Sequence, residues 1–172
     1  INSTATHSTV INGVDNQILN ISTYGTIAGG KDNRIGINDH SEYSFIGGGR
    51  QNDIHQDRWN VIVGGSENVL GDVSIGVGSF IGAGRQNEIG GGDFNFIGCG
   101  FRNKVSASGD HDLNTIAGGR DGIIPYGAYN FIGGGDDNKI SHGGFGNANT
   151  IGGGYNNQVY RGGHNVVAGG YN

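Results

Sequence analysis

Aliphatic residues recur along this chain at two fixed places relative to an Asn. The shared phrase is x-aliphatic-small-small-Gly-x-x-Asn-x-aliphatic, as in FIGGGRQNDI at 45–54. Each aliphatic is flanked by residues of different character, so we expect two short strands in each copy. The anchor position of the successive copies is occupied by Asn16, Asn33, Asn52, Asn68, Asn87, Asn103, Gly122, Asn138 and Asn157.

The spacing of these anchors predicts the fold. They are separated by 17, 19, 16, 19, 16, 19, 16 and 19 residues. A short fixed period is typical of a solenoid, in which each unit stacks only on its neighbours. We therefore predict an all-β parallel β-roll or β-solenoid, whose 16- and 19-residue coils alternate in a 35-residue double repeat. We expect residues 1–172 to form a single β-solenoid domain, as a fragment of a longer surface protein.

The residues around each anchor predict a turn. A Gly stands three residues before every anchor, and Asn and Gly accept positive φ more readily than other residues. We expect the anchor itself to lie in the left-handed region, with stacked Asn side chains hydrogen-bonded along the ladder. The small residues two places after the first aliphatic, Cys99 among them, are expected to face the core.

The outer faces of the two predicted strands differ. Outside the second strand the residues are mostly polar, as in Gln17, Arg34 and Lys104. Outside the first strand, opposite the core aliphatics, the residues are Phe, Val or Thr. An exposed apolar stripe of this length usually marks an interface. The predicted oligomer interface contains Phe45, Val61, Phe80, Phe96, Phe131 and Val166.

Composition and charge exclude several classes of function. The net charge is −5 and the isoelectric point is near 5.5, which argues against a general nucleic-acid binder. No apolar run approaches the roughly 20 residues of a membrane span, so no membrane insertion is expected. The Gly-rich strings precede no helix, which argues against a phosphate-binding loop. No cofactor, metal site or catalytic residue is predicted.

Two short groups of Asp and His residues leave a weaker possibility open. Asp39-His40 and Asp110-His111-Asp112 lie in the longer loops and could bind a cation or perform acid–base chemistry. No matched partner for them is evident elsewhere in the chain, so the alternative is ordinary surface polarity.

Two columns spaced 35 residues apart are candidates for ligand binding. Trp59, Phe94 and Tyr129, continued by His164, form one column, and Arg50, Arg85 and Arg120 form the other. At about 4.8 Å per coil, residues two coils apart lie roughly 10 Å apart, close to a disaccharide repeat of an extended glycan. Aromatic faces can pack on sugar C–H groups, and Arg suits uronate or sulfate. Alternatively, the aromatic residues widen a subunit interface and the Arg residues are solvated copies left by duplication.

The phrases FIGGGRQN, FIGAGRQN and TIGGGYNN resemble the heads of YadA-type trimeric adhesins. They also resemble Gly-rich repeats of bacteriophage and large-virus fibres, including host-recognition surface proteins of chlorella viruses. The resemblance covers essentially the whole chain, although the coils here are longer than those of YadA-type heads. It implies a left-handed β-roll, a homotrimer, attachment to a host surface and no catalytic residues.

The function we expect is that of a non-enzymatic trimeric adhesin or host-recognition module that binds a cell-wall or cell-surface glycan. It would act outside the cell, on a virion or a bacterial surface. Two alternatives remain open: a tailspike-like enzyme that degrades polysaccharide, and a purely structural fibre spacer. An enzyme would need a carboxylate pair, or a base with a Tyr or Arg, in one groove.

Overall fold

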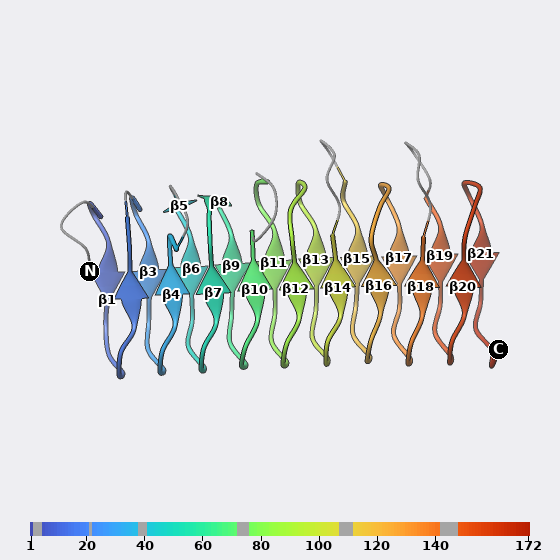
Figure 1. The fold of residues 1–172 in the computed structure, drawn as a ribbon, viewed down its shortest axis with the longest axis horizontal. Coiled ribbons are helices and arrows are strands. Elements are labelled where there is room, and N and C mark those ends of the chain that lie inside the picture. Colours follow the sequence, from blue (N-terminus) through green and yellow to red (C-terminus); the bar gives the residue numbers. More distant parts are fainter. Residues whose placement is uncertain (2–4, 21, 38–40, 72–75, 107–111, 142–147) are drawn as a thin grey trace.

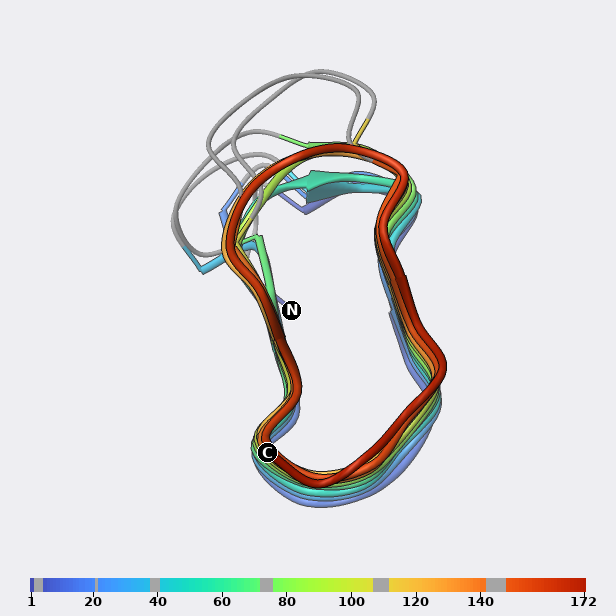
Figure 2. The ribbon, with the colours of Figure 1, turned by 90° about the vertical axis from the view of Figure 1, so that its right-hand side faces the viewer.

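The chain forms an all-β parallel solenoid (Figure 1). The computed structural model describes residues 1, 5–20, 22–37, 41–71, 76–106, 112–141 and 148–172. Within these ranges every regular element is a strand of two residues, and none is a helix. Figure 2 shows the coils superposed end-on as one elongated ring.

Two long parallel sheets form the sides of the solenoid. Their strand orders are β1-β3-β6-β9-β11-β13-β15-β17-β19-β21 and β2-β4-β7-β10-β12-β14-β16-β18-β20. The ten-stranded sheet contains β1 (Thr9–Val10), β3 (Thr26–Ile27), β6 (Phe45–Ile46), β9 (Val61–Ile62), β11 (Phe80–Ile81), β13 (Phe96–Ile97), β15 (Thr115–Ile116), β17 (Phe131–Ile132), β19 (Thr150–Ile151) and β21 (Val166–Val167). The nine-stranded sheet contains β2 (Gln17–Ile18), β4 (Arg34–Ile35), β7 (Asp53–Ile54), β10 (Val69–Leu70), β12 (Glu88–Ile89), β14 (Lys104–Val105), β16 (Ile123–Ile124), β18 (Lys139–Ile140) and β20 (Gln158–Val159). A small third sheet pairs β5 (Ser41–Glu42) with β8 (Asp57–Arg58).

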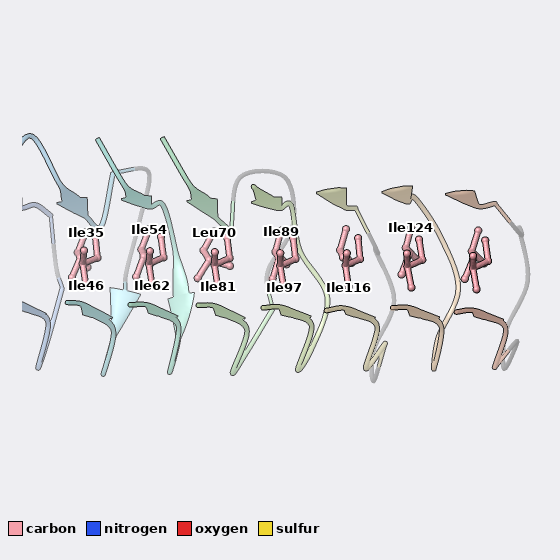
Figure 3. Close-up of a cluster of buried hydrophobic side chains, with 14 of the residues drawn as sticks. Ile35, Ile46, Ile54, Ile62, Leu70, Ile81, Ile89, Ile97, Ile116 and Ile124 are labelled. Carbon is pink, nitrogen blue, oxygen red and sulfur yellow. The ribbon is translucent and has the colours of Figure 1, made fainter. Parts of the chain in front are cut away.

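The core is a double file of aliphatic side chains between the two long sheets (Figure 3). Ile46 of one sheet and Ile54 of the other are both fully buried, and the same holds for nearly every coil. The register pairs like with like, since Ile46 lies beside Ile62 and Ile35 beside Ile54. Burying a side chain of this size contributes about 1.5–3 kcal/mol, so the stack drives folding. The two predicted aliphatic columns are thereby confirmed as the core.

A ladder of buried Asn side chains lines the turn that joins the two sheets. We call the anchor residues from Asn16 to Asn157 the anchor ladder. Asn68 is representative: its Nδ2 donates to Oδ1 of Asn52 at 3.0 Å, to the carbonyl of Gly64 at 3.0 Å and to that of Gly84 at 3.1 Å. Its Oδ1 accepts from the backbone nitrogen of Asn87 at 3.0 Å and from Nδ2 of Asn87 at 3.2 Å. The predicted hydrogen bonding along the ladder is confirmed.

The prediction that the anchor itself has positive φ is wrong by one residue. The left-handed residue is the one before each anchor, as in Gln51 (φ 54°) and Glu67 (φ 57°), whereas the anchor Asn turns inward to the ladder. The Gly three residues before each anchor does have positive φ. A Cβ on Gly84 would lie 2.2 Å from the carbonyl oxygen of Gly100 in the next coil, so stacking itself requires Gly there.

The small residues after the first strand do not face the core. Cys99 was expected to be buried, but it is exposed. The physical reason is the length of the strands. β13 ends at Ile97, so the inward and outward alternation stops before Cys99, where the chain already bends into the turn.

Candidate binding surface

A second polar ladder positions the chain where it enters the ten-stranded sheet. The backbone nitrogen of Asn114 donates to Oδ1 of Asn95 at 2.9 Å, and Asn130 donates in the same way to Asn114 at 3.0 Å. These side chains are buried, so their bonds fix the backbone just outside the core. The entry ladder, as we call it, consists of Ser44, Asn60, Ser79, Asn95, Asn114, Asn130, Asn149 and Asn165.

A mostly aromatic, exposed column lies one residue before each member of the entry ladder, and it continues in the first two coils, where it precedes Ser8 and Gly25. Trp59, Phe94 and Tyr129, which the sequence singled out, lie in this column and are 54%, 50% and 54% exposed. The structure extends it to every coil, because the same position also carries other rings. The aromatic column comprises His7, Tyr24, Tyr43, Trp59, Phe94, Tyr129 and His164, and Gly78, Leu113 and Ala148 occupy the remaining coils.

All ten positions of the aromatic column have left-handed backbone. The φ of Trp59 is 58°, that of Phe94 is 53° and that of Tyr129 is 60°. This conformation costs a non-Gly residue roughly 1–2 kcal/mol, and bulky residues adopt it less readily than Asn or Asp. The chain contains its own comparison, because the turn residues before the anchors share this φ and are Asp, Gln, Glu, Arg or Asn. The local backbone therefore does not account for the aromatic residues.

The rings of the column differ in whether their faces are covered. The rings of Tyr24 and Tyr43 stack with centroids 4.8 Å apart and an angle of 8° between their planes, so each covers one face of the other. Trp59, Phe94 and Tyr129 stack on no other ring of the described residues.

The ring of Phe94 packs against Gly78 of the preceding coil. A Cβ on Gly78, one coil earlier, would lie 2.7 Å from two carbons of the Phe94 ring, so this ring rests directly on the backbone of that coil. Within the aromatic column, His7, Tyr24 and Tyr43 thus stack on one another, whereas Trp59, Phe94, Tyr129 and His164 stack on no ring of the described residues.

The predicted apolar stripe lies two residues further along, on the outer face of the ten-stranded sheet. Phe45, Phe96 and Phe131 are exposed, at 36%, 38% and 39%, and Phe80 stacks on Phe96 with centroids 5.2 Å apart. Each Phe is followed two residues later by Gly. The ring leans over that Gly, with Cε1 3.3–3.4 Å from where a Cβ would be. The Phe rings thus lie along the sheet and widen its apolar surface. Of the other predicted interface residues, Val61 is half-buried and Val166 is exposed.

The Arg column lies at the other end of the strands. Arg50, Arg85 and Arg120 occupy the turn after the ten-stranded sheet, joined through the intervening coils by parallel bridges. Their guanidinium groups pair within the turn. Arg50 and Arg85 each approach Glu67 at 3.5 Å. Arg120 pairs with Asp136 and lies 3.8 Å from Asp121. The structure therefore separates the Arg column from the aromatic column.

Hydrogen bonds and ion pairs in this turn shift the pKa values of three of its side chains. The hydrogen bond from Gln86 holds the pKa of Glu67 below its ordinary value, and Arg85 adds to the effect. The hydrogen bond from Arg120 lowers the pKa of Asp136 and, reciprocally, Asp136 raises that of Arg120. Glu67 and Asp136 are therefore engaged in ion pairs with the Arg column.

Other candidate chemistry is sparse. A shallow hollow of about 310 Å³ is lined by Asp15, Gln17, Asp32, Arg34 and Gln51. Among the described residues, no group of three His, Cys, Asp or Glu side chains could hold a metal ion. Asp39, His40, Asp110 and His111 lie outside the described residues, whereas Asp112 is described and buried. No helix in the described ranges is long and apolar enough to cross a membrane.

Comparison of the chain with protein-family models and with curated proteins found no match to either.

The sequence reasoning missed His7, Tyr24 and Tyr43 in the aromatic column, together with the whole entry ladder. The signal was present, because these rings stand nine residues before the anchors, as Trp59 does before Asn68. Tyr24 also stands 35 residues before Trp59, so the 35-residue period points to it as well, whereas His7 and Tyr43 lie in the coils between, which that period passes over.

Proposed function

We propose that this chain is a non-enzymatic adhesin or host-recognition module that assembles as a homotrimer and attaches to a polysaccharide of a host cell wall or cell surface. A left-handed winding, the regular alternation of 16- and 19-residue coils, and a location on a virion or bacterial surface belong to the same proposal. These parts rest on the repeat phrases and their resemblance to adhesin heads and viral fibres.

The observation that carries the proposal is the aromatic column at left-handed φ. A residue kept in an unfavourable conformation supports a functional reading when the local backbone gives no reason for it. Here polar residues fill the other left-handed column, whereas rings occupy seven of the ten positions of this one. Exposed aromatic faces provide apolar contact with sugar C–H groups, and Tyr and Trp add polar tips for hydroxyl groups.

The ladder geometry favours an extended glycan that runs along the solenoid axis. Trp59 and Phe94 are two coils apart, as are Phe94 and Tyr129, which corresponds to roughly 10 Å at the spacing of parallel strands. Each contact is weak, so useful affinity would come from several rings acting together and from copies in the oligomer. The Arg residues are paired and lie at the opposite end of the strands, so the ligand of the aromatic column is a neutral polysaccharide.

The Phe stripe supports the oligomeric part of the proposal. Phe45, Phe80, Phe96 and Phe131, with Val61 and Val166, lie on the outer face of the ten-stranded sheet and remain partly exposed in a single chain. Burial of this stripe between subunits would remove it from water. Closed dimers are the commoner symmetric assembly, and the resemblance to trimeric adhesins is what favours three chains.

The test of glycan binding uses a panel of immobilised neutral and anionic polysaccharides and host cell walls. Replacing Trp59 by Ala should weaken binding modestly, whereas replacing Trp59, Phe94 and Tyr129 together should abolish it. The matched control replaces Gln51, Gln86 and Asn156 by Ala, since these residues have the same φ and lie in the other turn. Unchanged binding by a triple aromatic variant that folds as the same oligomer would refute the assignment of the site.

The test of assembly is light scattering of the purified chain. A trimer mass at micromolar concentration is expected, and the F80D/F96D variant should shift it towards the monomer. A monomer mass for the unmodified chain would contradict the proposed interface.

A further inference from the structure

The anchor ladder contains one break, at Gly122. The anchor before it, Asn103, still accepts a hydrogen bond from the backbone nitrogen of Gly122 at 2.9 Å. Gly122 has no side chain, so it offers no Oδ1 to accept a hydrogen bond from Asn138. The φ of Gly122 lies outside the left-handed region, so the backbone does not require Gly there.

The break leaves two backbone groups without partners, a nitrogen in the buried Asn138 and a carbonyl in the half-buried Gly118. In the other coils the backbone nitrogen of an anchor donates to the preceding anchor, as Asn157 does to Oδ1 of Asn138 at 2.9 Å. Within the described part of the chain, no acceptor serves the backbone nitrogen of Asn138, a residue only 1% exposed. The carbonyl of Gly118, which the Nδ2 of an anchor at 122 would reach, likewise has no donor among the described residues.

We propose that Gly122 marks an internal binding site for a small neutral molecule that can both donate and accept hydrogen bonds. The structure gives the chemistry of this ligand. It must accept from the backbone nitrogen of Asn138 and donate to the carbonyl of Gly118. It would lie next to Oδ1 of Asn103 and Cγ2 of Ile116, which are 2.9 Å and 3.5 Å from where a Cβ of residue 122 would be. Water satisfies both requirements, and buried polar groups of this kind commonly hold an ordered water.

A primary amide fits the site more fully than water. The side chain that the other anchors carry and Gly122 lacks is a CH₂–CONH₂ group, which is acetamide less one hydrogen. Its NH₂ group would donate to Gly118 and its oxygen would accept from Asn138, as the anchor Asn does in the neighbouring coils. This inference is independent of the proposed glycan binding, because the site lies in the opposite turn and inside the coil.

The test compares thermal unfolding of the natural chain and of the Gly122→Asn variant, each with and without acetamide. The variant carries its own carboxamide at the site and is the matched control. We expect acetamide to raise the Tm of the natural chain by about 2–4 °C relative to its effect on the variant, since a ligand that binds only the folded state stabilises it. N,N-dimethylacetamide, which has no N–H donor, should give no such rise in the natural chain.

Equal shifts for acetamide and N,N-dimethylacetamide in the natural chain would overturn the amide assignment, and this comparison holds even where the variant fails to fold. A high-resolution crystal structure without the amide tests the water. Density bridging the nitrogen of Asn138 and the carbonyl oxygen of Gly118 is expected. A direct protein acceptor on the nitrogen of Asn138, with no space beside Gly122, would refute the site.

Discussion

Removing one carboxamide from the anchor ladder should destabilise the solenoid far more than its small volume implies. Asn68 is the best place for the test, because it lies in the middle of the chain and its ladder contacts are complete. The Asn68→Ala substitution removes five hydrogen bonds, three donated by Nδ2 and two accepted by Oδ1.

The magnitude follows from the groups left without partners. The carbonyl of Gly84 keeps the backbone nitrogen of Ser66 as a donor at 2.9 Å, and Oδ1 of Asn52 keeps the backbone nitrogen of residue 68 at 3.1 Å. The backbone nitrogen of Asn87 loses its acceptor and lies in a buried residue, and the carbonyl of Gly64 loses its donor. An orphaned buried group costs about 1–3 kcal/mol, so we expect a loss of about 2–6 kcal/mol for the two groups together.

The assay is urea unfolding followed by circular dichroism. The control is Ser66→Ala, two residues away, whose hydroxyl makes no hydrogen bond within the described residues. The control should lie within about 0.5 kcal/mol of the natural chain. A loss below about 1 kcal/mol for Asn68→Ala would show that water replaces the ladder bonds, and the reasoning about buried orphans would be refuted.

Two further predictions concern the turns. Gly84→Ala should prevent stable folding or cost more than about 3 kcal/mol, because its Cβ would lie 2.2 Å from the carbonyl oxygen of Gly100. The control Gly48→Ala should be tolerated, because a Cβ there meets nothing within 4 Å. Thermal unfolding compares the two variants, and equal Tm values would contradict the close stacking of the coils. The lowered pKa values of Glu67 and Asp136 imply a contribution to stability that is present above their ordinary values of 4.5 and 3.8 and is lost as pH falls through the lower values of the folded state. The urea midpoint should therefore hold from about pH 7 to 5 and fall below pH 4.5, and E67Q/D136N should lose less on acidification; an identical fall in this variant would assign the effect to other groups.

Much of the fold could be predicted because each coil presents the same environment. Ile46, Ile62 and their equivalents recur at one offset from the anchor, so the same kind of side chain is buried in the same place in each coil. The turn was harder to predict. Asn is common both at left-handed φ and in buried ladders, and composition alone does not separate the two. At position 68 the hydrogen bonds of the side chain explain why the residue is Asn, whereas the left-handed conformation belongs to Glu67.

The candidate site was only partly predictable for a different reason. Trp59 and Phe94 were found by their 35-residue spacing, but their left-handed φ and the coverage of Tyr24 by Tyr43 depend on how adjacent coils stack. The Arg column was found by the same spacing. Its ion pairs with residues such as Glu67 could not be read from the sequence, because they join side chains of different coils.

The most direct test of glycan binding by the aromatic column uses the fluorescence of Trp59, the single tryptophan of the chain. Trp59 is 54% exposed, so its emission should resemble that of a solvated indole in the free protein. Titration with oligosaccharides of the polysaccharide that the chain binds should shift this emission to shorter wavelength, because a sugar face on the ring excludes water. The shift should saturate together with binding. Binding to that polysaccharide with unchanged Trp59 emission would contradict the account and place the contact elsewhere on the solenoid.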